Sequence, residues 1–253
     1  MSCSGNKYAA TNRAYKKQVK RIAKSIRQVP IKDSLNSPPY WVGTTNFNMR
    51  KPNYVIIHHT AQNSCDQTLK TFTLPRTQVS AHYVICKDGT VHHMLNDYLR
   101  AWHGGIAKWG SLTDINSASI GIELDNNGKE GFNYFQINSL LRILDTLKRK
   151  YTIPQVNFIG HSDIAPTRKN DPNVFFPWKE LADRGFGLWY GDTTGLVVPK
   201  DFNHLQALRI IGYHTKDSIA AIKAFKRHYL QDTIPLMNDR DRRILYSLME
   251  ELD

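Results

Sequence analysis

The sequence predicts an α/β (mixed α+β) fold: one central mixed β-sheet flanked by helices, followed by a small three-helix bundle. Three observations support this prediction. From residue 50 to about residue 180, short runs of β-branched residues alternate with amphipathic segments, which is typical of a single sheet with helices packed on it. After Asp192 the apolar residues recur only at helical spacing. The first 51 residues hold eleven of the 34 basic side chains and one of the 22 acidic ones.

These features divide the chain into a basic N-terminal arm at 1–49, a main domain at 50–191 and a helical domain at 192–253. A chain of 253 residues with 41% hydrophobic and 11% aromatic residues can build a core, so global disorder is excluded. No apolar stretch approaches the roughly 20 residues of a membrane span. The three cysteines form no Cys-x-x-Cys pair. We expect Cys65 and Cys86 to be free thiols, with a disulfide between them as the alternative.

The arm contains an amphipathic segment that predicts a helix ending before Pro30, followed by an extended connection over 30–52. Two interpretations stay open: the apolar stripe packs on the main domain while the charges face water, or the helix contacts an anionic surface. The first 51 residues carry +10 of the net charge of +12. A nucleic-acid partner is not expected, because few aromatic residues lie between these charges. The stripe consists of Tyr15, Val19, Ile22 and Ile26.

The predicted sheet consists of short apolar runs that end at turn or loop residues. Two of these runs flank Lys87-Asp88-Gly89, and the Asp-Gly pair at the tip is a hairpin signal. Between the last two runs, apolar residues recur at helical spacing from Ile137 to Tyr151, which predicts an amphipathic helix. In chain order, the predicted strands lie at 54–58, 81–86, 90–95, 119–124 and 156–159.

Three short amphipathic segments after residue 192 predict the helical bundle. Each has one apolar face, and the first ends at Gly212, a residue that often terminates helices. The three stripes are Phe202, Leu205, Leu208 and Ile211; Ile219, Ile222, Phe225 and Tyr229; and Leu245, Leu248 and Leu252.

Histidines cluster where chemistry is expected: seven of the ten lie between His58 and His161. His58 ends the first predicted strand, and His161 begins a polar loop after the last one. Loops at strand ends are common places for catalytic groups. These two histidines and one carboxylate would satisfy the three-ligand rule for catalytic zinc, with a fourth position open for water. The residues alone also allow each histidine to be an ordinary polar residue at a strand end.

Five motifs occur in order over residues 50–180. They are Tyr-Val-Ile-Ile-His-His-Thr-Ala (54–61), Val-Ser-Ala-His-Tyr-Val-Ile (79–85), Ala-Trp-His-Gly-Gly (101–105), Ser-Ile-Gly-Ile-Glu-Leu (119–124) and the Gly-His-Ser-Asp-Ile-Ala-Pro-x-Arg-Lys-x-Asp-Pro run (160–172). Together they resemble the zinc-dependent N-acetylmuramoyl-L-alanine amidases, a superfamily that includes phage lysozyme-type amidases and animal peptidoglycan recognition proteins. The similarity is strongest to the bacterial periplasmic lipoprotein amidases and their anhydromuramyl relatives.

The resemblance implies one Zn²⁺ per chain and assigns roles to single residues. Glu123 would be the general base that takes a proton from the attacking water, and Lys169 would place its ammonium beside the developing oxyanion. His59 is expected to pack beside the site, because the family's first ligand comes directly after the apolar run. The implied ligands are His58, His161 and Asp171.

The implied reaction is hydrolysis of the amide between N-acetylmuramic acid, or its 1,6-anhydro form, and L-Ala of the peptidoglycan stem peptide. We expect a monomer that binds peptidoglycan and muropeptides. The alternative is a non-catalytic protein that binds or senses peptidoglycan. The helical domain is similar to a peptidoglycan-binding module, with a plain stabilising bundle as its alternative. The residues expected to line the substrate groove are Trp102, His103, Trp109 and Asn126.

The N-terminus, Met1-Ser2-Cys3-Ser4-Gly5, has no intact secretory signal. A Cys followed by small polar residues is how a bacterial lipoprotein begins after its signal is removed. With the resemblance, this predicts a periplasmic, outer-membrane lipoprotein of a Gram-negative bacterium, attached to the membrane through lipidated Cys3. An ordinary cytoplasmic N-terminus is the alternative.

Overall fold

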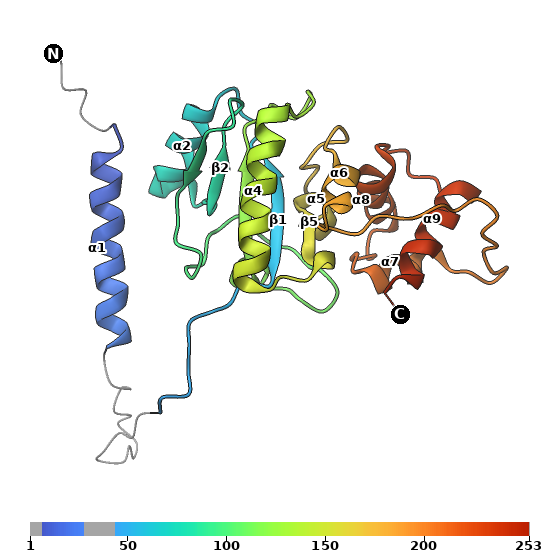
Figure 1. Cartoon of the computed structure of the whole chain (residues 1–253), viewed down its shortest axis with the longest axis horizontal. Coiled ribbons are helices and arrows are strands. Elements are labelled where there is room, and N and C mark those ends of the chain that lie inside the picture. The colour runs from blue at the N-terminus through green and yellow to red at the C-terminus, as the bar shows by residue number, and fades with distance from the viewer. Residues whose placement is uncertain (1–6, 28–43, 253) are drawn as a thin grey trace. The chain divides into compact units, whose positions relative to one another are not determined.

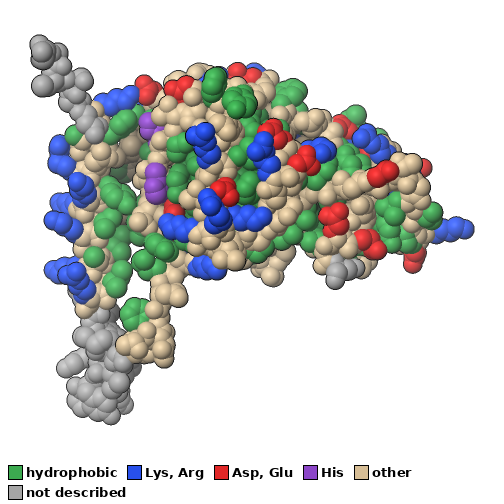
Figure 2. Space-filling model, in the orientation of Figure 1, with side chains coloured by type: hydrophobic (Ala, Val, Ile, Leu, Met, Phe, Trp, Pro, Cys, Tyr) green, Lys and Arg blue, Asp and Glu red, His purple; other side chains and the backbone are tan. Residues whose placement is uncertain are grey.

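The structure is a computed structural model that describes residues 7–27 and 44–252. It divides into two units, residues 1–49 and 50–253. In the first unit, the predicted helix is confirmed as α1 (Ala9–Ile26), and none of its residues is buried. Lys and Arg side chains line α1, whereas acidic and basic side chains are interspersed on the visible face of the second unit (Figure 2). Most of the predicted extended connection, and Cys3, lie outside the described residues.

The second unit is built on a five-stranded sheet with the strand order β3-β2-β4-β1-β5. β1 is parallel to β4 and β5, β2 is parallel to β4, and β3 is antiparallel to β2. The predicted mixed sheet and the hairpin at residues 87–89 are therefore confirmed. The strands are β1 (Tyr54–His59), β2 (Tyr83–Ile85), β3 (Val91–His93), β4 (Ser119–Leu124) and β5 (Phe158–Gly160).

The register of the parallel strands brings three motifs to the same edge of the sheet. His58 lies opposite Glu123 across β1 and β4. On the other side of β1, Ile57 lies opposite Gly160, the residue before His161. Since all three strands run in one direction, their carboxyl ends meet there, which is where ligands bind in open α/β sheets.

Helix α4 (Tyr134–Tyr151) covers one face of the sheet and lies across β1 (Figure 1). Its N-terminus is capped by Asn133, whose side chain accepts a hydrogen bond from the backbone N–H of Gln136. Its leucines pack against Val55 and Ile57 of β1 in one fully buried cluster. Side chains alternate between the faces of a strand, so Ile56 and His58 point to the opposite face.

On the opposite face, the part of the sheet formed by β1 and β5 packs with the C-terminal helices. Ile56 of β1 and Ile159 of β5 share one buried cluster with Leu208, Phe225 and Leu245 of these helices. Each fully buried side chain of this size contributes about 1.5–3 kcal/mol. The predicted helices after residue 192 are present, and they share this buried cluster with two strands of the sheet. The helices of this part are α7 (His204–Ile211), α8 (Ser218–Leu230) and α9 (Asp239–Glu250).

Gly212 shows how closely the C-terminal helices approach the loop that carries Trp109. It follows α7 with φ +135°, and a Cβ there would lie 2.4 Å from the ring of Trp109. The backbone N–H of Gly110 donates to the Gly212 carbonyl at 2.8 Å. Only glycine allows this contact without displacing the indole ring.

The remaining elements are short. None of the helices within residues 7–27 and 44–252 is both long and apolar enough to cross a membrane. The elements are α2 (Cys65–Thr73), α3 (Ile115–Ala118), α5 (His161–Ile164), α6 (Trp178–Asp183) and the 3₁₀ turns at Pro75–Thr77 and Gln155–Asn157.

The prediction that Cys65 and Cys86 are free thiols was wrong. The two residues form a disulfide, with their Cα atoms 5.3 Å apart. Cys65 begins α2 and Cys86 follows β2, so packing of this helix beside this strand brings them together. His92 lies close enough to complete a three-residue metal-binding group, but both sulfur atoms are engaged in the disulfide.

A buried polar cluster joins the C-terminal helices to α5. The Asp163 carboxylate accepts hydrogen bonds from the Tyr213 hydroxyl at 2.9 Å, from His228 Nδ1 at 2.8 Å and from the Gly160 backbone N–H at 2.7 Å. The His228 ring stacks on Trp178, with ring centroids 3.9 Å apart. Because α5 begins with His161, this cluster also holds the helix that carries one of the predicted ligands.

Tyr213→Phe should lower the free energy of unfolding by about 1–3 kcal/mol, because it leaves one oxygen of buried Asp163 without its donor. Tyr246→Phe is the matched control, since the Tyr246 hydroxyl has no hydrogen-bond partner among the described residues; its effect should stay within about 0.5 kcal/mol. Urea unfolding followed by circular dichroism measures both. Equal effects of the two substitutions would contradict the importance of the cluster.

Candidate metal centre and active site

Two histidines and one aspartate converge at the carboxyl ends of β1 and β5. His58 Nδ1 lies 2.9 Å from His161 Nδ1 and 3.1 Å from Asp171 Oδ2, and His161 Nδ1 lies 2.9 Å from the same oxygen. All three side chains are buried. The structure therefore brings together the three residues that the sequence analysis selected, and they form a group that could hold a metal ion.

Local structure explains how residues far apart in sequence reach this point. His58 is at the end of β1, and His161 follows β5 directly. The loop after α5 folds back beside His161 and brings Asp171 to it, because the Ser162 N–H donates to the Asp171 carbonyl at 2.7 Å. The Arg168 guanidinium braces this loop by donating to the carbonyls of Gly104 and Ile106 at 2.9 and 2.8 Å.

The hydrogen bonds around the three side chains indicate that they can bind a metal ion. His161 Nε2 lies 3.1 Å from the Gly104 carbonyl oxygen, which can only accept, so this nitrogen carries the proton in the neutral ring. The Nδ1 lone pair then points at the Asp171 carboxylate, and two acceptors at 2.9 Å repel each other. A cation between them removes the repulsion. Two imidazoles and one carboxylate match the three protein ligands of a catalytic zinc site, whose fourth position takes water.

Burial favours the neutral form of His58 that metal binding needs. The ring is almost inaccessible, and burial, together with the nearby His161, lowers the pKa of His58 to about 4. His59 points to the other face of β1 and does not belong to the convergent group. The expected packing role of His59 agrees with this arrangement.

Glu123 lies in the strand next to His58, with part of its carboxyl group buried. It lies opposite His58 in the sheet, and its Oε2 atom is buried without a hydrogen-bond partner among the described residues. Burial, and then the charge of Asp171, raise the pKa of Glu123 to about 8, although Lys169 acts in the other direction. A carboxyl group that titrates near neutral pH can both take and return a proton.

Lys169 stands two positions before Asp171 and is partly exposed. Its charge acts on both Glu123 and His58, so its ammonium group lies within electrostatic range of the site. In the described part of the chain, its Nζ atom has no hydrogen bond or ion pair with protein. This cation is therefore available to an anionic group of a bound molecule.

The structure separates the four residues expected to line the groove. Trp102 is 53% exposed and can contact a ligand. Asn126 is buried, where its amide donates to the carbonyls of Glu130 and Gly131 and shapes that loop. His103 is buried as well, and its Nδ1 lies 3.1 Å from His58 Nε2. Both side chains act within the protein.

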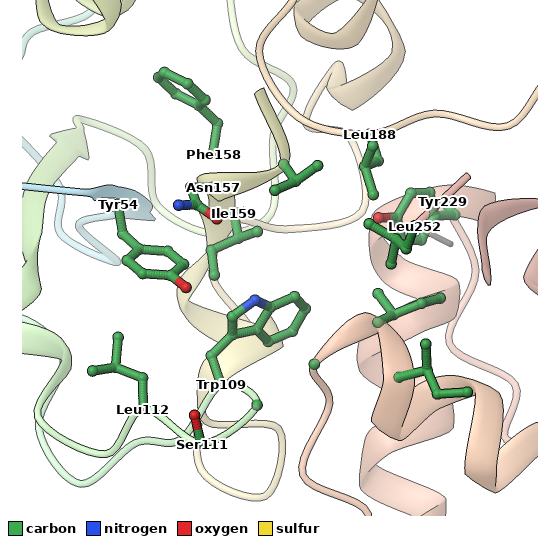
Figure 3. A pocket seen from close by; sticks show the side chains of 15 residues that line it. Tyr54, Trp109, Ser111, Leu112, Asn157, Phe158, Ile159, Leu188, Tyr229 and Leu252 are labelled. Atoms are coloured by element: carbon green, nitrogen blue, oxygen red, sulfur yellow. The ribbon is translucent and has the colours of Figure 1, made fainter. Parts of the chain in front are cut away.

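Trp109 lies at the other end of the sheet. Its indole ring, 9% exposed, borders a cavity of about 380 Å³ together with Tyr54, the first residue of β1, and Leu252 (Figure 3). His58 is at the opposite end of the same strand. The structure therefore supports a packing role for Trp109, between the sheet and the C-terminal helices.

Comparisons with known proteins agree with this geometry. The family model described as N-acetylmuramoyl-L-alanine amidase matches residues 48–174. The amidase AmiD of Escherichia coli is 36% identical over 205 residues, which are 75% of this chain and 70% of AmiD. The 1,6-anhydro-N-acetylmuramyl-L-alanine amidase AmpD of Haemophilus influenzae is 34% identical over 103 residues, and the match spans 40% of this chain and 56% of AmpD.

Two solved structures extend the likeness to the C-terminal helices. AmiD of E. coli, in complex with anhydro-N-acetylmuramic acid-L-Ala-D-gamma-Glu-L-Lys, superposes with a TM-score of 0.72 at 26% identity, over 87% of this chain and 97% of AmiD. AmpDh3 of Pseudomonas aeruginosa, in complex with anhydromuramic pentapeptide, gives 0.73 at 26% identity, over 86% of this chain and 98% of AmpDh3.

The unpaired carboxyl group of Glu123 should make the metal-free protein less stable as pH rises. Its pKa of about 8 in the folded protein exceeds the ordinary 4.5, so the stability of the neutral form is complete below about pH 4.5 and is lost as pH rises through 8. Glu123→Gln keeps the group neutral. It should add about 0.5–2 kcal/mol to the free energy of unfolding at pH 8 and nothing at pH 4.

Urea unfolding between pH 4 and pH 9 measures this difference. Glu180→Gln, at an exposed position of α6, is the control and should show no pH-dependent gain. A gain from Glu123→Gln that is the same at every pH would contradict the predicted ionisation.

Proposed function

This chain belongs to the N-acetylmuramoyl-L-alanine amidase family, and from that premise we propose that it is a zinc-dependent hydrolase. It cleaves the amide bond between N-acetylmuramic acid, or its 1,6-anhydro form, and L-Ala of the peptidoglycan stem peptide. The observation that carries the proposal is the buried convergence of two imidazoles and one carboxylate beside the unpaired Glu123. The proposed ligands are His58, His161 and Asp171.

Zinc held by three protein ligands supplies Lewis acidity, which polarises a carbonyl group and makes water a better nucleophile. The rest of the chemistry falls to side chains of this chain. Glu123, with a pKa near neutrality, takes a proton from the attacking water. The same carboxyl group then returns the proton to the nitrogen of L-Ala as the amide bond breaks.

Lys169 stabilises the negative charge that develops on the carbonyl oxygen during attack. Its ammonium group has no protein partner among the described residues, so it can turn to the substrate. A fixed positive charge at the developing oxyanion is worth most where water is excluded. A non-catalytic peptidoglycan-binding protein is not favoured, because it would need neither the complete ligand set nor a buried carboxyl group with a raised pKa.

Substitutions separate metal binding from proton transfer. Glu123→Ala should keep zinc near one per chain and lose activity, since Glu123 is not a ligand. His161→Ala and Asp171→Ala should lose zinc and activity together. Lys169→Ala should keep zinc and turn over about 10²–10³ times more slowly.

Zinc is measured by elemental analysis and activity by release of stem peptide from muropeptides. Lys200→Ala, at an exposed site between α6 and α7, is the control and should behave like the parent. Hydrolysis at the parent rate by Glu123→Ala would overturn the assignment of the base. Full zinc content in Asp171→Ala would overturn the ligand set.

The proposed partners are peptidoglycan and its fragments, and the proposed state is a monomer. We also propose that the protein works in the periplasm of a Gram-negative bacterium, attached to the outer membrane through lipid on Cys3. The residue order Cys3-Ser4-Gly5 supports this proposal. Peptidoglycan binding by the C-terminal helices stays a prediction, and the two interpretations of α1, packing on the main domain or contact with an anionic surface, both stay open.

In the native organism, the N-terminal peptide should carry diacylglycerol on the Cys3 sulfur, and the protein should sediment with outer membranes. The Cys3→Ser protein should appear in the soluble fraction. The Cys65→Ser protein should be distributed between the membrane and soluble fractions as the parent protein is. Mass spectrometry of the N-terminal peptide and membrane fractionation measure these outcomes. A native peptide that begins at Met1 with an unmodified Cys3 would rule out the anchor.

A further inference from the structure

His103 lies behind the metal-binding group, in contact with its first ligand. The ring is buried, with Nδ1 3.1 Å from His58 Nε2 and Nε2 3.2 Å from Ser119 Oγ. Ser119 Oγ in turn lies 2.6 Å from the backbone carbonyl of Ile115. These contacts form an unbroken chain from a backbone carbonyl to the ligand His58.

The donor and acceptor of each hydrogen bond in this series follow from its last member, the Ile115 carbonyl. A carbonyl oxygen can only accept, so the single hydroxyl proton of Ser119 is donated to Ile115. Ser119 Oγ can then only accept from His103, which places a proton on His103 Nε2. No carboxylate contacts His103 among the described residues, and an unpaired buried cation is costly, so the ring is neutral. Its Nδ1 atom therefore accepts a hydrogen bond from the Nε2–H group of His58.

We propose that His103 is a positioning residue that fixes the tautomer of His58, so that the His58 Nδ1 lone pair faces the metal. This proposal rests on the proposed function, because it concerns the ligand set of the zinc amidase. Outer groups that hold a ligating histidine in one tautomer and orientation are worth about 10–100-fold in metal affinity. Here the outer group is a second histidine, itself oriented by Ser119.

The same short loop orients both histidine ligands. The His103 ring accepts a hydrogen bond from His58 Nε2 at 3.1 Å. The carbonyl oxygen of the next residue, Gly104, accepts one from His161 Nε2, also at 3.1 Å. Asn116 holds the loop, because its Oδ1 accepts from the backbone N–H groups of both loop residues at 3.1 and 2.8 Å. Each ligand thereby presents Nδ1 to Asp171.

The sheet is shaped to admit this ring. Gly121 of β4 lies beneath His103, and a Cβ at that position would be 2.4 Å from the imidazole. Such a contact is impossible without moving the ring, so glycine at 121 is required for His103 to reach His58. The close packing also leaves the ring little freedom to turn away from its two partners.

The test measures zinc affinity and the His58 tautomer, neither of which depends on turnover. His103→Phe keeps much of the ring volume and removes the acceptor, so zinc affinity in chelator competition should fall about 10–100-fold. His103→Asn can place an amide oxygen near the former Nδ1 atom and should recover part of this loss. Ser119→Ala should weaken zinc binding in the same direction, because the His103 tautomer is no longer fixed.

Long-range ¹H–¹⁵N NMR of the metal-free parent protein should show His58 protonated at Nε2, with a mixture of tautomers in Ser119→Ala. Parent zinc affinity in His103→Phe, or a His58 ring protonated at Nδ1 in the parent, would overturn the proposal. If the His103→Phe protein fails to fold, the zinc affinity of the Ser119→Ala protein and the His58 tautomer in the parent spectrum still test the proposal. A parent protein that binds no zinc at all would instead overturn the proposed function.

Discussion

The candidate site depends on the parallel pairing of β1 with β4 and β5. This pairing places His58 opposite Glu123 and brings the start of α5 beside the same strand end. A shift of one residue in register would send these side chains to opposite faces of the sheet. The apolar residues that alternate with the polar ones prevent such a shift, because Ile57 and Ile122 must stay in the core under α4.

The site concentrates groups that oppose folding. Two imidazoles and a carboxylate meet with their acceptor atoms about 3 Å apart, and the Oε2 atom of Glu123 is buried without a hydrogen-bond partner among the described residues. Desolvated polar groups of this kind are destabilising by themselves. The two buried clusters of the second unit offset this cost.

The C-terminal helices belong to the same physical unit as the chemistry. They share a buried cluster with Ile56 of β1 and Ile159 of β5, and Tyr213 and His228 hydrogen-bond Asp163 within the helix that begins with His161. The solved structures of AmiD and AmpDh3 align along these helices as well, since each match covers more than four fifths of this chain. These helices therefore also support His161, one of the three proposed metal ligands.

The sequence by itself determined the elements with strong local signals: the strand at 119–124, the turn at 87–89 and the amphipathic helices. Motifs that resemble a family also predicted which two histidines and which aspartate the structure brings together. Tertiary structure alone decided three further matters: the Cys65–Cys86 disulfide, the merging of the C-terminal helices with the sheet, and the position of His103 behind His58. The physical reason is that each depends on contacts between residues distant along the chain, which leave no periodic or compositional trace in a single sequence.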